Sequence, residues 1–222
     1  GSVMLADSKI NSEVVYNKYD IFKQLYYLYM FGGILMLAFC IVQIFNNSKV
    51  IRRIINVFHG LIAFFFALHM AGLIVRWYIS GHAPWSDAYE SMIYVAWATM
   101  FFGLAFGKDS KLTVASTAFV TSMILMIAHW NWMDPSIGNL QPVLNSYWLM
   151  IHVAVIVGSY GPFTLAMVLG LIALFLMIFT TDKNKEKMKM SIDEITYINE
   201  LALTVGLVML TIGNFFGGQW AN

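Results

Sequence analysis

Six long apolar runs constrain the fold of this chain more than any other feature. A helix needs about 20 residues to cross a hydrocarbon core of about 30 Å. The runs reach or approach that length, at about 25–45, 54–79, 88–106, 112–130, 148–180 and 195–216. Hydrophobic residues make up 59% of the chain, a share that would leave large apolar patches on a water-soluble domain. The sequence therefore predicts an all-α polytopic transmembrane helix bundle of about six spans, with extracytoplasmic loops or short interfacial helices.

Glycine and proline interrupt two of these runs. The fifth run is too long for one perpendicular span, and Gly158, Gly161 and Pro162 divide it. We therefore expect an interfacial or re-entrant start over 144–157, followed by a kinked span. The glycine pair at 217–218 is expected to end the sixth span.

Basic residues mark one side of the predicted bundle. Nine of the thirteen lysines and arginines lie in the links after the first, third and fifth runs. Because cytoplasmic links carry an excess of Lys and Arg, this side is predicted to face the cytoplasm. Residues 1–24, polar and mixed in charge, then form an extracytoplasmic segment or linker, and 80–87, 131–147 and 217–222 lie on the same outer side. A net charge of +1 gives no sign of a nucleic-acid partner.

Aromatic rings and imidazoles gather on that outer side. Six of the seven tryptophans lie near the outer ends of the runs, and His82, His129 and His152 lie at the same boundary. Tryptophan is ordinary at a bilayer interface, whereas several histidines among the rings are less so. The single cysteine, Cys40, provides neither a disulfide nor a thiolate cluster within this chain. Flat aromatic surfaces with neutral imidazoles suit a flat, apolar ligand that contains iron.

The first outer loop carries Arg76 and His82, followed by residues that can begin a helix. Ser86 or Asp87 can cap the next helix, and Glu90 falls in its first turn. One interpretation is a loop that holds Arg76 and His82 against the carboxylates of a bound ligand. The other is a well-capped corner between two helices, with Arg76 as an anchor that reaches toward the interface.

Trp148 and His152 form the second candidate site. Asn145 or Ser146 can cap a helix that starts near Tyr147, and residues four apart on a helix share one face. A ring and an imidazole on one face, at the outer membrane edge, could support an axial ligand to iron. The alternative from spacing alone is a buried histidine bonded to a backbone carbonyl.

At these residues the chain resembles a known family. Gly81-His-Ala-Pro-Trp-Ser-Asp-Ala-Tyr-Glu-Ser91, the Pro-x-Leu-x-Ser-x-Trp-Leu-x-x-His pattern that ends at His152, and the segment 211–222 carry the resemblance. All three are similar to segments of the heme-handling CcsA/ResC family of bacterial and plastid cytochrome c biogenesis, including the fused CcsBA form of epsilon-proteobacteria. Residues 25–222 then form a CcsA-like transmembrane heme-handling domain that ends at the start of the tryptophan-rich WWD segment.

The resemblance implies heme b as the ligand and His152 as an axial ligand of its iron. The WWD segment packs against the macrocycle, and Trp220 and Asn222 match its opening. Trp148, Arg76 and His82 join the predicted heme contacts, Arg76 as a contact to a propionate. The second axial histidine is expected outside this segment, and the chain is expected to be incomplete at its C-terminus.

The resemblance also implies an activity and a place in the cell. The intact protein would export or present heme and attach it covalently to the Cys-x-x-Cys-His motif of an apocytochrome c, a synthase or lyase activity. It would lie in the bacterial inner membrane, with the heme-site loops facing the periplasm, and work with a CcsB/ResB-like partner, fused or separate.

Two other functions remain open. A b-type respiratory subunit needs paired intramembrane histidines at facing depths, and His59 and His69, ten residues apart on one helix, lie about 15 Å apart along its axis. A heme-free scaffold or transporter subunit is the other alternative. Its usual signs are charged residues inside the spans or symmetric broken helices, and these are mostly missing here.

Overall fold

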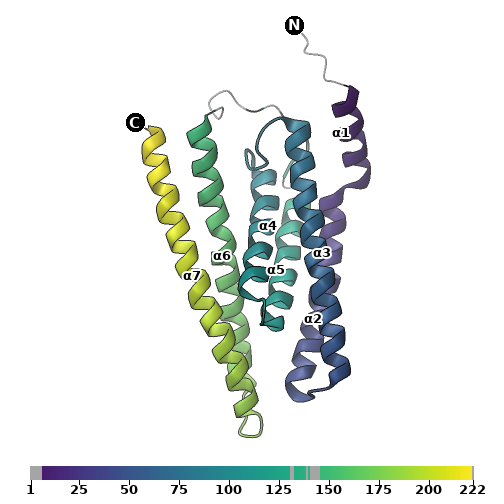
Figure 1. Ribbon diagram of the computed structural model, residues 1–222, viewed down its shortest axis with the longest axis vertical. Coiled ribbons are helices and arrows are strands. Elements are labelled where there is room, and N and C mark those ends of the chain that lie inside the picture. Colours follow the sequence, from purple (N-terminus) through teal and green to yellow (C-terminus); the bar gives the residue numbers. More distant parts are fainter. Residues whose placement is uncertain (1–6, 131–132, 139, 141–145, 222) are drawn as a thin grey trace.

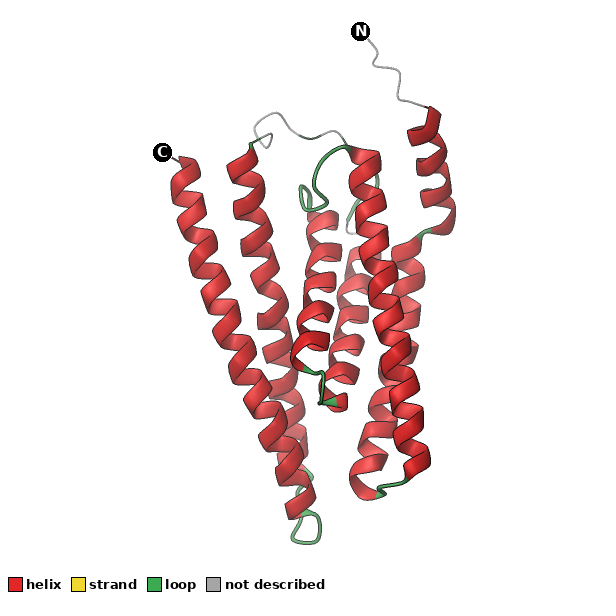
Figure 2. Cartoon of the chain, in the orientation of Figure 1, coloured by secondary structure: helices red, strands yellow, loops and turns green. Residues whose placement is uncertain are grey.

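Seven helices make up the chain in the computed structural model, which describes residues 7–130, 133–138, 140 and 146–221 (Figure 1). They are α1 (Asp7–Tyr19), α2 (Ile21–Phe45), α3 (Lys49–Ser80), α4 (Ala88–Phe106), α5 (Lys111–His129), α6 (Tyr147–Ile178) and α7 (Lys185–Ala221). The described part of the chain contains no strand (Figure 2). The predicted all-α class is therefore confirmed.

Five segments of the described chain are long and apolar enough to cross a membrane, judged by length and composition. They are Ser8–Phe45, Lys49–Ser80, Lys111–His129, Tyr147–Ile178 and Lys185–Gln219. The remaining expected span forms α4, which packs against α5 and α6 within the same bundle. The chain is thus a multi-pass helical membrane protein.

The helices form two outer pairs with a central pair between them. Figure 1 shows α6 beside α7 at one side, α2 beside α3 at the other, and α4 and α5 between. The links after α2, α4 and α6 all lie toward one end of the bundle, and the loop after α3 lies at the opposite end (Figure 2). The basic links are therefore gathered at one end, as expected. The compartment that this end faces stays a prediction.

Side-chain caps and one glycine set the helix ends. Ser48 and Ser110 accept hydrogen bonds from the first-turn amides of α3 and α5. Asp87 caps α4 by accepting from the Glu90 N–H at 2.7 Å, which confirms one of the two predicted caps. Gly81 ends α3 with a φ of 74°, a left-handed conformation that costs glycine little.

Two expected breaks are wrong. α6 is one continuous helix from Tyr147 to Ile178 with Pro162 inside it, so no break divides the run at 158–162. Residues 144–145 of the expected start lie outside the described residues, and the expected kink stays a prediction. α7 likewise continues past the glycine pair at 217–218 to Ala221. Gly161 packs against a neighbouring helix instead, because its added Cβ would lie 2.8 Å from the Ala98 backbone of α4, whereas nothing lies within 4 Å of a Cβ on Gly218. Small residues at such contacts let membrane helices approach closely.

Close packing of small residues also holds α5 at the centre. Thr117 and Ser116 are buried, and their hydroxyls donate to carbonyls one turn back in α5, so they bury no unpaired polar group. A Cβ on Gly33 of α2 would come within 2.7 Å of the Phe119 amide nitrogen. α2 and α5 therefore touch backbone to backbone, without a side chain between them.

We expect Gly33→Ala to destabilise the bundle, because an added methyl group must push α2 away from α5. Overpacking of this kind costs about 1–3 kcal/mol. The measurement is thermal unfolding in detergent, followed by the loss of helical circular dichroism. Gly60→Ala is the matched control, since nothing lies within 4 Å of its added Cβ and alanine favours a helix by up to about 1 kcal/mol. Equal or higher stability of Gly33→Ala would contradict the close contact.

Candidate functional site

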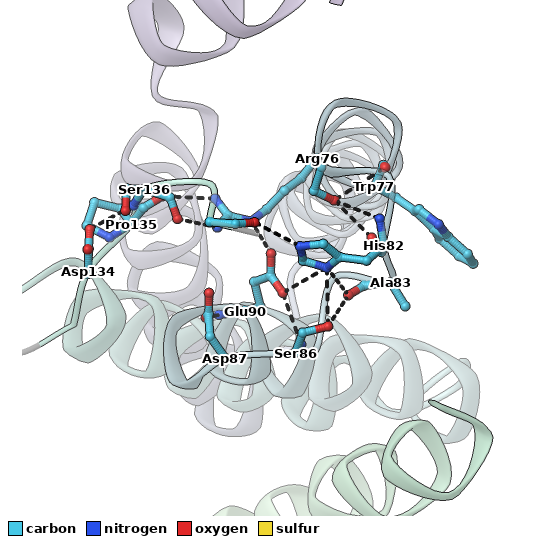
Figure 3. Close-up of polar contacts among 12 residues, drawn as sticks. Arg76, Trp77, His82, Ala83, Ser86, Asp87, Glu90, Asp134, Pro135 and Ser136 are labelled. Carbon is cyan, nitrogen blue, oxygen red and sulfur yellow. Dashed lines mark hydrogen bonds and ion pairs between the residues drawn. The ribbon is translucent and has the colours of Figure 1, made fainter. Parts of the chain in front are cut away.

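A buried arginine organises the end of the bundle opposite the basic links. The Arg76 side chain near the end of α3 has no exposed surface, and its Nε donates to Glu90 Oε1 at 2.9 Å. Its two Nη atoms donate to the Pro135 and Ser136 carbonyls at 3.0 and 3.1 Å (Figure 3). Nη1 also donates to the Tyr16 hydroxyl at 3.4 Å. Four hydrogen bonds thus satisfy a charge that would otherwise be costly to bury.

Glu90 connects this arginine to the loop between α3 and α4. Its Oε2 accepts a hydrogen bond from the Ser86 N–H at 3.0 Å, while Oε1 receives the Arg76 guanidinium. The Nδ1 atom of His82 lies 3.9 Å from Oε2 (Figure 3). Both carboxylate oxygens are therefore held within the protein, and the loop is fixed to the first turn of α4.

Both ring nitrogens of His82 contact oxygen atoms of the surrounding loops. Nδ1 lies 3.2 Å from both the Ala83 carbonyl and the Ser86 hydroxyl, and Nε2 lies 3.2 Å from the Gly138 carbonyl. A cavity of about 110 Å³ lies between this loop and residues of α6 such as Met150. Ligand pockets usually measure about 300–1,000 Å³, so a macrocycle does not fit this space as it stands.

The second half of the network comes from the loop after α5. Asp134 accepts a hydrogen bond from the Ser136 N–H at 2.9 Å, which lowers the pKa of the Asp134 carboxyl below its usual value. This turn presents the Pro135 and Ser136 carbonyls to Arg76 (Figure 3). The loop after α5 is thereby joined to α3.

Part of the N-terminal segment belongs to this network as well. Residues 7–19, within the expected linker 1–24, form α1, which packs on α3. Asp20 then adopts a φ of 41°, a left-handed conformation that aspartate tolerates, and separates α1 from α2. Tyr16 brings α1 to Arg76, so the segment contacts the buried charge directly.

His152 lies on the other side of this end, where α6 meets α7. Its Nδ1 is 2.7 Å from the Gly213 carbonyl of α7. Gly217 lies one turn further on, so close that an added Cβ would fall 2.5 Å from the His152 Cε1 atom. Nε2 has no hydrogen-bond partner among the residues that the structure describes, and it is not sealed from solvent. The imidazole is thus held through one nitrogen and free at the other.

Trp148 and His152 lie on the same side of α6, as predicted. Trp148 contacts Phe216 of α7 with 6.4 Å between ring centroids, and about half of its side chain is exposed. Ser146 is the N-cap residue of α6, without a side-chain hydrogen bond. Trp220 lies in the last turn of α7, but its side chain and all of Asn222 fall outside the described residues.

The structure brings the predicted residues together in two groups rather than one. Arg76 and His82 meet at Glu90, a carboxylate of the protein itself. Trp148 and His152 meet at the α6–α7 contact. The alternative of a histidine bonded to a backbone carbonyl matches the contact with Gly213, and the role of His152 as an axial ligand to iron stays a prediction. A role for Arg76 or His82 in ligand binding stays a prediction, and it would require some of their present bonds to exchange.

Sequence reasoning missed three residues that position these side chains. Glu90 was interpreted only as a favourable charge in a first helical turn, although a buried arginine in a membrane span demands an acidic partner nearby. Gly217 was expected to end the sixth span, and Gly213 received no prediction of its own. Their four-residue spacing was the available signal, because it places two glycines on one helix face.

The two remaining histidines of α3 lie apart, as their spacing predicts. His69 is fully buried, with Nε2 3.0 Å from the Ile93 carbonyl. His59 contacts the Lys111 ammonium group at 3.2 Å, toward the end with the basic links. Across the described ranges, no three His, Cys, Asp or Glu side chains come together as a metal site.

Comparisons with known proteins agree on one group of relatives. The family described as "Cytochrome C assembly protein" matches residues 85–222. Protein NrfI of Wolinella succinogenes is 40% identical over 220 residues, which cover 99% of this chain and 24% of NrfI. Cytochrome c biogenesis protein CcsA of Nandina domestica is 29% identical over 73% of this chain and 64% of that protein. CcsA of Chlamydomonas reinhardtii is 32% identical over 68% of this chain and 44% of that protein. The chain spans less than two thirds of each of these relatives.

We expect Glu90→Gln to destabilise the fold, because it leaves the buried Arg76 charge without a counter-charge. Breaking such a pair costs about 3–5 kcal/mol. Chemical or thermal unfolding in detergent measures the loss, with Glu186→Gln, an exposed residue of α7, as the control. Replacing both Arg76 and Glu90 by Leu should cost less than the two single changes together. If Glu90→Gln unfolds at the same midpoint temperature as Glu186→Gln, the ion pair does not stabilise the fold.

Proposed function

Because this chain belongs to the cytochrome c assembly protein family, we propose that it is part of a membrane protein that presents heme and attaches it to apocytochrome c. Heme is then a substrate that passes through the protein. One observation supports this most strongly: the His152 imidazole is anchored through Nδ1, and its Nε2 has no hydrogen-bond partner in the described part of the chain. Family membership supports the process, and His152 supplies the chemical group that the process needs.

The hydrogen bond of His152 suits it to bind iron. A histidine that binds a metal usually donates its other ring N–H to a carbonyl or carboxylate, which fixes the tautomer and orients the ring. With a proton on Nδ1 donated to the Gly213 carbonyl, the Nε2 lone pair is available to heme iron. Iron held by histidine is common in heme proteins. The second axial histidine would come from a part of the protein outside this chain.

Trp148 offers a flat apolar surface beside that nitrogen. It lies one turn before His152 on α6, and about half of it is exposed. The macrocycle of a heme bound to His152 would have apolar faces to cover, and an indole ring covers such a face well. Trp220 would extend this surface in the intact protein, at the start of the tryptophan-rich segment.

The attachment reaction needs orientation more than acid–base chemistry. Each substrate thiol adds across one heme vinyl group: sulfur bonds to one carbon, and the thiol proton goes to the other. Two additions form two thioethers, and no oxidant or reductant is consumed. The protein would hold the macrocycle with its vinyl edge open toward the Cys-x-x-Cys-His segment. A neutral imidazole exchanges, so the substrate histidine can replace one axial ligand and release the product.

The proposed setting follows from the charge distribution. The basic links would face the cytoplasm of a bacterium, and the His152 end would face the periplasm, where the apocytochrome arrives. A CcsB/ResB-like partner, fused or separate, would complete the intact protein.

We expect His152→Ala to abolish low-spin heme in the intact protein purified in detergent, because an axial ligand is lost. The measurement is the visible spectrum in the oxidised and reduced states, before and after adding imidazole. Imidazole should restore the low-spin spectrum, as it replaces the missing side chain. His129→Gln, an imidazole at the end of α5, should leave the spectrum unchanged. A parent protein without heme, or a spectrum indifferent to His152, would overturn the proposal.

Gly217→Ala tests the position of the imidazole without removing it. The added methyl group would overlap the ring of His152, so the ring must tilt or move. We expect weaker heme retention, by about tenfold, from the loss of one well-oriented metal ligand. Gly218→Ala is the control, because nothing lies within 4 Å of its added Cβ. Identical heme titrations for the two variants would show that α7 does not position His152.

A further inference from the structure

Two aromatic side chains donate hydrogen bonds to the backbone of α6 on either side of His152. The Trp85 Nε1 atom donates to the Met150 carbonyl at 3.2 Å, and the Tyr94 hydroxyl donates to the Ala154 carbonyl at 3.2 Å. Trp85 lies in the loop between α3 and α4, and Tyr94 lies in the second turn of α4. Their ring centroids are 5.0 Å apart, so the two donors form one contact surface for α6.

The two bonded carbonyls lie on the face of α6 that packs against α4. Met150 and Ala154 are four residues apart, and Gly158 continues the same face after four more. A Cβ on Gly158 would lie 3.2 Å from the Tyr94 hydroxyl. A carbonyl oxygen has two lone pairs, so it can accept a side-chain donor in addition to its helical hydrogen bond. The aromatic donors therefore hold α6 without breaking its helical bonds.

His152 lies on the opposite face of α6, which packs against α7. Two residues correspond to about 200° around a helix, so its side chain points nearly away from both bonded carbonyls. Ile156 and Phe163 follow on this face. A Cβ on Gly213 would lie 2.6 Å from Ile156, and one on Gly206 of α7 would lie 2.9 Å from Phe163. At the level of the imidazole, α6 is therefore held between α4 and α7.

The buried ion pair fixes the loop that carries Trp85. Ser86, the next residue, donates its amide N–H to Glu90 Oε2 at 3.0 Å, and the Trp85 amide donates to the Ala83 carbonyl at 2.9 Å. The Trp77 ring of α3 contacts the Trp85 ring, with 5.7 Å between centroids. Trp85 thus reaches α6 from a loop that is itself held in place, so its bond can resist movement of α6.

We propose that Trp85 and Tyr94 are positioning residues, which fix the rotation of α6 and thereby direct the Nε2 atom of His152 toward heme iron. The inference rests on the proposed function, because it assigns them a role in presenting that ligand. A functional group must be held within about 0.5 Å and 10–20° of its productive geometry. Two bonds one turn apart oppose both rotation and sliding of α6, whereas the Gly213 carbonyl holds the imidazole at a single point.

The chain offers a matched control for each donor. The Trp97 Nε1 atom and the Tyr29 hydroxyl are also buried, but neither has a hydrogen-bond partner among the residues that the structure describes. Replacement by phenylalanine removes the same atoms from Trp85 as from Trp97, and the same hydroxyl from Tyr94 as from Tyr29. An effect that depends on a bond to α6 should therefore appear in only one member of each pair.

The test measures how firmly the intact, detergent-purified protein retains heme. Heme transfer to an excess of apomyoglobin is timed, and visible spectra are recorded in the oxidised state. We expect Trp85→Phe and Tyr94→Phe each to lose heme about fivefold faster than the parent, from the loss of one neutral hydrogen bond. Part of their heme should become high-spin, and added imidazole should restore the low-spin spectrum. Trp97→Phe and Tyr29→Phe should stay within about twofold of the parent, because no bond is lost.

The spectra separate a positioning role from a merely structural one. If imidazole leaves the heme of Trp85→Phe and Tyr94→Phe high-spin, the site has collapsed and the positioning role is overturned. Equal heme retention in all four phenylalanine variants, together with low-spin heme that depends on His152, overturns the positioning role and leaves the proposed function standing. Absence of heme that depends on His152 overturns the proposed function, and the positioning role with it.

Discussion

The buried ion pair between Arg76 and Glu90 is the interaction on which one end of this bundle depends. The pair has almost no exposed surface, and through it α1, α3, α4 and the loop after α5 meet at one guanidinium. Isolated buried charges are costly in a membrane protein, so each of these segments is constrained by the need to satisfy Arg76. The loop that carries His82 is fixed as a consequence, because the Ser86 amide bonds to the same carboxylate.

The helices could be predicted from the sequence because their signals are local. Runs of about 20 apolar residues, the Asp87 cap and the glycine at 81 each act within one or two turns. The division expected at 158–162 and the span end expected at the 217–218 glycines were wrong for the opposite reason. A glycine in a helix can signal an end or a close contact, and only the neighbouring helix decides between them. Gly161 meets the Ala98 backbone, which no pattern in α6 reveals.

The candidate site was predicted unevenly for a similar reason. A four-residue spacing places Trp148 beside His152 on one helix, and this relation needs no tertiary information. The Gly213 carbonyl, 61 residues from His152, depends on how α7 lies against α6. Arg76 and His82 were expected near carboxylates, and the nearest carboxylate belongs to Glu90. The residue types thus predicted what kind of group would be contacted, whereas only the tertiary structure shows which residue supplies it.

The unbroken course of α7 links the two ends mechanically. Its 37 residues correspond to about 55 Å of continuous helix, which carries Asp193 toward the basic links and the Gly213 carbonyl at His152. α7 packs mainly on α6 and touches the rest of the bundle little. A stiff rod attached along one side transmits displacement along its length. Any axial slide of α7 that moves Asp193 at one end must also shift the carbonyl that orients the imidazole near the other.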